Sequence, residues 1–120
     1  MTTINSTMTY IGPSDNVRLI TWASLANGDD GAPAEWVDFA DRCFQVTGTF
    51  GSGGSCTIQG SNDGATWASL SDPQGNALTF GSTKIEQALE LPRYVRPAVT
   101  AGDGTTSLTI TLCMRRVVRP

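Results

Sequence analysis

The segment SLTITLCMR (residues 107–115) alternates apolar and polar side chains without a break. A two-residue period places successive side chains on opposite faces of a β-strand, so one face of this strand is expected to be buried and the other exposed. CFQVTGTF (residues 43–50) shows the same alternation. The expected inward positions are Phe44, Val46, Gly48 and Phe50 in one segment and Leu108, Ile110, Leu112 and Met114 in the other.

Further strand-like runs follow one another, separated by turn-forming residues at spacings of about eight to twelve residues. SNDG at residues 61–64 predicts a tight hairpin turn, because Asn, Asp and Gly tolerate positive φ. Short strands at this spacing are typical of a sandwich or barrel. We therefore predict an all-β fold, an antiparallel two-sheet sandwich that is jelly-roll-like. The remaining runs cover residues 17–26, 55–60, 66–70, 76–80 and 93–100.

Three segments depart from this simple pattern. EWVDFA (residues 35–40) fits either a strand or a single helical turn. KIEQALELP (residues 84–92) is rich in helix formers, but it is short and ends at a proline, which favours extended structure. Pro97 lacks the N–H that a central strand donates, so its strand is expected to lie at a sheet edge or to be bulged there.

The polar N-terminal segment contains the sequence Gly-Pro-Ser at residues 12–14. We expect residues 1–16 to form an extended arm that becomes ordered against a neighbouring molecule, and residues 17–120 to form a single β-sandwich domain. The arm's candidate interface residues are Ile4, Tyr10, Ile11 and Pro13.

Charge and residue content argue against several classes of function. The formal net charge of −3 gives no basic footprint for nucleic acid. No stretch approaches the ~20 apolar residues of a membrane span, and the first residues lack the features of a secretory leader. The chain has no histidine, which removes His-based nucleophilic machinery and the commonest transition-metal ligand. We expect no enzymatic activity, no cofactor, and no nucleic-acid or membrane partner.

The cysteines and the acidic pairs offer only weak indications of chemistry. Cys43, Cys56 and Cys113 are odd in number and lack CxxC spacing, so free thiols in a reducing compartment are expected, with a disulfide as the less favoured alternative. The adjacent aspartates at 29–30 fit a calcium contact less well than a solvated turn. The carboxylates at 35 and 38 are a pair of the kind that any acidic protein offers.

Acidic and basic residues are concentrated in different parts of the chain, the former in residues 29–41 and the latter in the C-terminal third. These charges face each other either within one chain or between copies, where they would steer symmetric assembly. The candidate interface residues of these two regions are Asp29, Asp30, Trp36, Arg93, Arg96, Arg115, Arg116 and Arg119.

The five-residue sequence TWASL occurs twice, at residues 21–25 and 66–70. When the two copies are aligned, the residues on either side of TWASL do not match, so a duplicated module is not expected. We expect Trp22, Trp36 and Trp67 to pack in the core or at a subunit contact. The alternative is exposed tryptophan that stacks on sugar rings, as in carbohydrate-binding modules.

TIQGSNDGATWASL, a turn followed by ALTF, and LPRYVRPAVTAGDGTTSLTITL occur in this order. The order resembles small virion proteins of tailed bacteriophages, in which a GSNDG…W hairpin precedes a YVRP strand and a final Thr-rich strand. The resemblance covers residues 44–116, although the hairpin alone also occurs in discoidin-like and sugar-binding sandwiches.

The resemblance implies a structural virion protein, and within that group a capsid decoration, or cement, protein. Such a protein would be made in the host cytoplasm, would bind the major capsid protein on the outer shell, and would form a homo-oligomer, with a trimer favoured. Its N-terminal arm would clamp several capsid subunits. The alternatives are a tail, neck or baseplate component and a carbohydrate-binding module for host glycans. The resemblance implies no catalytic or ligand residues.

Overall fold

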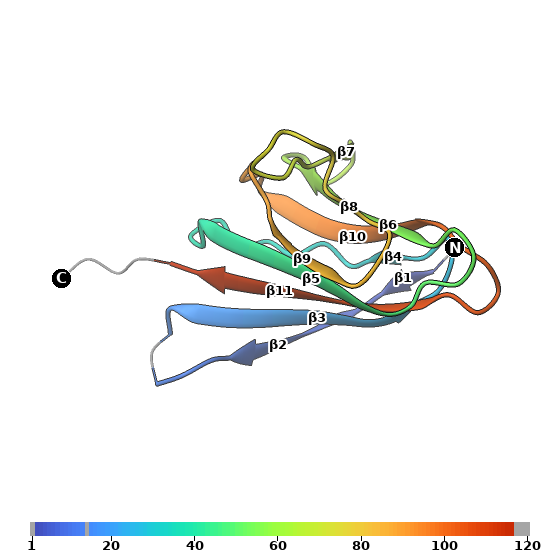
Figure 1. Ribbon diagram of the computed structural model, residues 1–120. Helices are drawn as coiled ribbons and strands as arrows, with labels where there is room; N and C mark the ends of the chain where they lie inside the picture. The colour runs from blue at the N-terminus through green and yellow to red at the C-terminus, as the bar shows by residue number, and fades with distance from the viewer. Residues whose placement is uncertain (1, 14, 117–120) are drawn as a thin grey trace.

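The computed structural model describes residues 2–13 and 15–116, and within them it contains strands and no helix. The strands form two sheets that pack face to face (Figure 1). All strand pairs are antiparallel except the pair β1–β4. The prediction of an all-β, antiparallel two-sheet sandwich is therefore confirmed.

The first sheet has the strand order β1-β4-β10-β6-β7, and β8 also pairs with β6. The second sheet has the order β2-β3-β11-β5-β9. The strands of the first sheet are β1 (Thr3–Ile4), β4 (Asp30–Gly31), β6 (Ser55–Ser61), β7 (Ala68–Ser69), β8 (Thr79–Phe80) and β10 (Tyr94–Ala101). Those of the second are β2 (Ser6–Tyr10), β3 (Val17–Leu25), β5 (Asp41–Thr49), β9 (Lys84–Gln87) and β11 (Ser107–Arg115).

The core lies between the two sheets and is built from the alternating apolar residues. All four predicted inward residues of β11 are buried, as are Phe44 and Val46 of β5. Gly48 is exposed near the end of β5, and Phe50 lies beyond the strand and is half-buried. The two-residue period thus identified the inner face of both strands. At the end of β5, however, it predicted two inward residues more than the structure buries. The first sheet contributes Cys56, Ile58, Phe80, Val95 and Val99 to the same core.

The N-terminal segment is extended, and the chain's own sheets hold it in place. β1 pairs with β4 in the first sheet, whereas β2 pairs with β3 in the second. Ile4 and Met8 pack against the core from these two strands. The part of residues 1–16 that the structure describes thus pairs with the chain's own strands.

Segments whose structure was ambiguous in the sequence are resolved as follows. Residues 35–40 form a turn rather than a strand, closed by the Phe39 N–H donating to the Trp36 carbonyl (3.1 Å). Residues 84–92 are extended, as favoured, with β9 at their start. The second copy of TWASL supplies only the short strand β7, whereas the first copy ends the long strand β3.

The expected edge position of Pro97 is wrong. β10 lies between β4 and β6, Pro97 is opposite Ile58, and the irregularity in β10 occurs after Val99 rather than at the proline. Val95 and Val99 donate their N–H groups toward the side where β4 lies, so the Pro97 nitrogen faces that side too. Gly31 leaves room there, since a Cβ on it would lie 2.6 Å from Pro97 Cδ. The ring fills the place of a ladder hydrogen bond.

Candidate functional site

Three connecting segments meet at one end of the sandwich, which we call the loop end. They are residues 11–13 and 15–16 between β2 and β3, residues 32–40 between β4 and β5, and residues 88–93 between β9 and β10. In Figure 1 the loop end is on the left, where β11 ends, and the N-terminus lies at the opposite end. The antiparallel register fixes this geometry, because the start of β3, the start of β5 and the end of β11 are aligned.

Arg42 of β5 points inward and connects two of these loops. Its guanidinium donates to the carbonyls of Phe39 (Nε, 2.9 Å), Trp36 (Nη2, 2.9 Å) and Pro92 (Nη1, 3.2 Å). The side chain is buried, and no carboxylate in the described part of the chain pairs with it. Burial lowers the pKa of Arg42. The carbonyl oxygens therefore satisfy a buried cation and hold the loops together.

Arg18 of β3 is the second buried arginine at this end. Its guanidinium lies over three aromatic rings, those of Trp36 (4.4 Å), Tyr10 (5.0 Å) and Phe39 (5.0 Å from the ring centroid). Asp15 pairs with its Nη2 at 3.4 Å, whereas its Nε has no hydrogen-bond partner among the described residues. Cation–π contact of this kind stabilises a desolvated guanidinium. Arg18 thus links the end of β2 to residues 32–40.

Arg116, directly after β11, is the third arginine of the loop end. It pairs with Asp15 (3.3 Å) and Asp38 (3.4 Å), and its guanidinium lies 5.1 Å from the Phe39 ring centroid. Its backbone N–H donates to the Asn16 carbonyl (2.9 Å). These contacts join the end of the chain's central strand to two of the loops.

Around these arginines, the loop end carries most of the exposed large apolar side chains of the described residues. Tyr10 (56%), Ile11 (42%), Val37 (64%), Leu89 (56%) and Leu91 (54%) are all exposed on or beside the three segments. Apolar side chains held on well-anchored loops, without a deep cleft, are typical of a surface that binds another macromolecule.

The acidic residues of segment 29–41 lie beside basic residues of the C-terminal third within the same chain. Asp30 pairs with Arg96 at 3.2 Å, and Glu35 pairs with Arg93. Asp41 and Arg115 are direct neighbours across β5 and β11. Asp30, Glu35 and Asp41 therefore have basic neighbours within the chain. The electrostatic attraction of these paired side chains for another molecule is then weaker than that of unpaired charges.

The other candidate interface residues are dispersed over the molecule. Asp29 accepts hydrogen bonds from the N–H groups of Thr2 (3.1 Å) and Ala26 (2.9 Å) at the end opposite the loop end. Ile4 is half-buried in β1, and Pro13 is exposed in the β2–β3 connection. Arg119 lies outside the described residues.

The tryptophans have three different environments. Trp22 is completely buried and donates its Nε1–H to the Ala32 carbonyl (2.9 Å). Trp67 is half-buried, and the guanidinium of Arg96 lies 4.1 Å from its ring centroid. Trp36 is also half-buried and carries Arg18 on its ring. Each of the two half-buried rings therefore has a protein guanidinium over one of its faces. That face is not available for stacking on a sugar.

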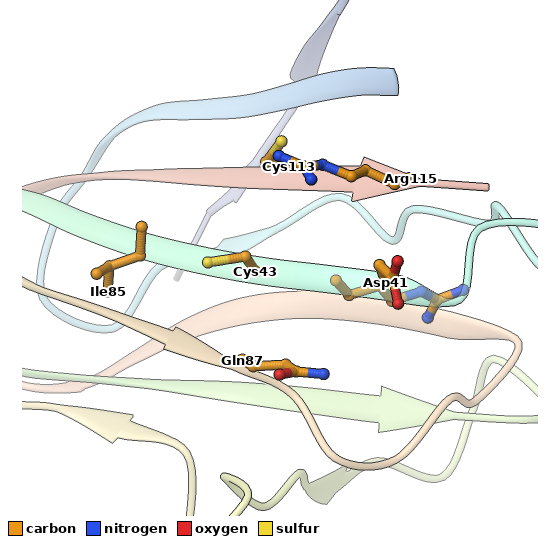
Figure 2. Close-up of a pocket in the computed structure, with 7 residues that line it drawn as sticks. Asp41, Cys43, Ile85, Gln87, Cys113 and Arg115 are labelled. Atoms are coloured by element: carbon orange, nitrogen blue, oxygen red, sulfur yellow. The ribbon is translucent and has the colours of Figure 1, made fainter. Parts of the chain in front are cut away.

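A hollow of about 410 Å³ lies on the outer face of the second sheet, across β5, β9 and β11 (Figure 2). It places Cys43 directly opposite Cys113, and both thiols are free. The pKa of Cys43 is raised, by burial first and then by the neighbouring Cys113. A protonated thiol is a weak nucleophile, so this geometry does not activate Cys43. The lining residues are Asp41, Arg42, Cys43, Ile85, Gln87, Cys113 and Arg115.

The third thiol and the carboxylates add no reactive cluster. Burial raises the pKa of Cys56 to about 12. Within residues 2–13 and 15–116, no three His, Cys, Asp or Glu side chains lie close enough together to hold a metal ion. The same residues contain no helix long and apolar enough to cross a membrane.

The sequence prediction missed the two arginines that organise the loop end. Arg18 shares its strand face with Ile20 and Trp22, and Arg42 shares its face with Phe44. A cation at an inward position of an alternating strand is the signal that would have found both, because it requires buried partners. The exposed Val37 and Leu91 carry no comparable sequence signal.

The fold defines a class of structure: a two-sheet antiparallel β-sandwich with three connecting segments gathered at one end. No family model and no curated protein matches the chain in sequence. Among solved structures, the chain is similar to the SPBc2 prophage-derived protein YomS, with a TM-score of 0.62 and 8% sequence identity. The match covers 82% of this chain and 93% of YomS, so the likeness is one of the whole fold.

Proposed function

We propose that this chain is a non-enzymatic structural protein of a phage virion, and specifically a capsid decoration protein that binds the outer surface of the shell and stabilises it. Its likeness in fold to a prophage-derived protein and the order of its hairpin and strand motifs support the virion assignment. The observation that carries the binding role is the loop end, where three anchored loops and the adjoining end of β2 present five exposed apolar side chains.

The arginine contacts of the loop end suit attachment to the major capsid protein. The buried arginines hold the loops before binding, so little conformational freedom is lost on attachment. Polar and charged residues around the apolar side chains supply the rim that such interfaces have.

The first test is the copy number and position of the chain in purified particles, measured by quantitative mass spectrometry against the major shell protein and by labelled imaging. Hundreds of copies spread over the shell are expected for a decoration protein. A few copies at one vertex would instead identify a tail, neck or baseplate component, and absence from particles would refute the virion assignment.

The second test changes the loop end. Val37→Asp combined with Leu91→Asp should reduce occupancy on shells at least tenfold, because two charges would be desolvated in the contact. The matched control is Ile85→Asp, which changes an equally exposed apolar residue on β9 outside the loop end. Binding is measured by co-sedimentation with shells. Equal loss for both variants would remove the loop end as the attachment surface.

A further inference from the structure

The outer edge of β2 is an unprotected sheet edge. β2 is the last strand of the second sheet, with β3 on one side and no described strand on the other, and it forms the lower border of the molecule in Figure 1. Its sequence, STMTY, contains no charge and no proline. Natural proteins usually protect a free edge with charges, proline, a bulge or shortness, so this edge is open to pairing with another strand.

The remaining edges of both sheets are protected. β9, at the other border of the second sheet, carries Lys84 and Glu86, which form an ion pair at 3.8 Å. In the first sheet β1, β7 and β8 have two residues each, too few for a ladder. β2 is thus the longest uncharged edge that the described residues contain.

The hydrogen-bond phase of β2 shows which of its backbone groups are free. The Ile11 N–H donates to the Val17 carbonyl at 3.1 Å, so the odd-numbered residues of this segment direct their N–H and C=O groups toward β3. In an antiparallel ladder the alternate residues direct theirs the opposite way. The backbone groups of Ser6, Met8 and Tyr10 therefore point away from the sheet.

We propose that two copies of this chain associate through β2, in an antiparallel pair with a two-fold axis at Met8. The free groups are self-complementary in this arrangement. Met8 would pair with Met8 of the second copy, and Ser6 with Tyr10 of the second copy, each as a hydrogen-bonded pair. The two second sheets would then form one continuous sheet, and the contact would be isologous, as two-fold contacts are.

The side chains are compatible with this pairing. Thr7 would lie opposite Thr9 of the second copy, and cross-strand threonine pairs are favourable. β2 brings no like charges together, so nothing opposes its approach to a copy of itself. A two-fold contact forms a dimer, which differs from the trimer that the phage resemblance implies.

The test places charges at the two outward threonines, both exposed in one chain. Thr7→Glu with Thr9→Glu would set like charges opposite each other and should abolish dimers, whereas Thr7→Glu with Thr9→Lys would set opposite charges together and should restore them. The mass is measured by analytical ultracentrifugation from about 10 μM to 1 mM chain, and the wild type should approach twice 12.7 kDa. Gln45→Glu with Thr49→Glu adds the same charge on β5 and should leave the dimer intact.

Amide hydrogen exchange gives a second readout that does not depend on variants. The N–H groups of Ser6, Met8 and Tyr10 should become protected as the concentration rises, while those of Thr7 and Thr9 are already protected by β3. A wild type that stays monomeric throughout this range overturns the proposal, as does dimerisation of the double-glutamate variant or exchange at Met8 that is independent of concentration. These outcomes are independent of whether the protein is found in virions.

Discussion

Asp103 shows how one half-buried carboxylate can hold two loops together. It accepts hydrogen bonds from the N–H groups of Ser52 (2.8 Å) and Thr105 (2.9 Å) and from the Thr105 hydroxyl (2.6 Å). The Thr106 hydroxyl donates in turn to the Phe50 carbonyl (2.8 Å). These bonds join the β5–β6 turn to the β10–β11 turn at the end of the molecule opposite the loop end.

This environment predicts a pH dependence. The hydrogen bonds, that from the Thr105 side chain first, lower the pKa of Asp103 from 3.8 to about 2. A lowered pKa means that the folded state favours the ionised form, so the stabilisation is complete above the ordinary pKa and is lost as the pH falls toward 2. Asp103→Asn should lower the free energy of unfolding at pH 7, and its difference from wild type should shrink between about pH 4 and pH 2.

Urea unfolding at several pH values measures this difference. A difference that stays constant down to pH 2 would assign the loss to changed turn packing rather than to the ionised carboxylate.

Arg42 is the residue on which the loop end most depends. Arg42→Met keeps the length of the side chain but leaves three carbonyls without their donor, and we expect it to lower the free energy of unfolding by about 3 kcal/mol. Arg93→Met is the matched control, since it removes an exposed ion pair with Glu35 and should change stability far less than Arg42→Met does. Equal effects in urea unfolding would contradict the anchoring role of Arg42.

At the scale of the strands, the two-residue period was a reliable guide only where a strand is long and has one buried face. It identified the inner faces of β5 and β11 because both strands cross the core. β1 and β4 have two residues each, too short to show any period, and they exist because they pair with each other and with β10. Pro97 misled the prediction because the ring fits against a residue far away in the sequence.

That fit makes Gly31 a sensitive position within β4. An added Cβ would lie 2.6 Å from both Pro97 Cδ and Trp22 Cδ1, and neither ring can move without disturbing the core. We expect Gly31→Ala to destabilise the fold by about 2 kcal/mol. Gly81→Ala, where a Cβ would meet nothing within 4 Å, should change stability by less than about 0.5 kcal/mol. Thermal unfolding of the two variants distinguishes the effect of a local clash at Gly31 from the effect of replacing any glycine by alanine.

At the scale of the whole molecule, the sequence showed that acidic and basic residues are separated but could not show where they meet. The answer depends on the sheet order, which brings Asp30 beside Arg96 and Glu35 beside Arg93. The loop end is also a product of that order, because it gathers three segments that are distant in the chain. The only sign of the loop end in the sequence is that two arginines occupy inward positions of alternating strands.

The position of β11 in the second sheet has a consequence for how the chain folds. β11 follows every other described strand in the sequence, yet it lies between β3 and β5. During synthesis β3 can pair with β2 and β5 with β9, but the side of each that faces β11 stays unpaired until residues 107–115 have left the ribosome. The sheet therefore closes late and through contacts distant in sequence. Such topologies fold slowly, and until the sheet closes the exposed apolar strand faces and unpaired edges favour aggregation.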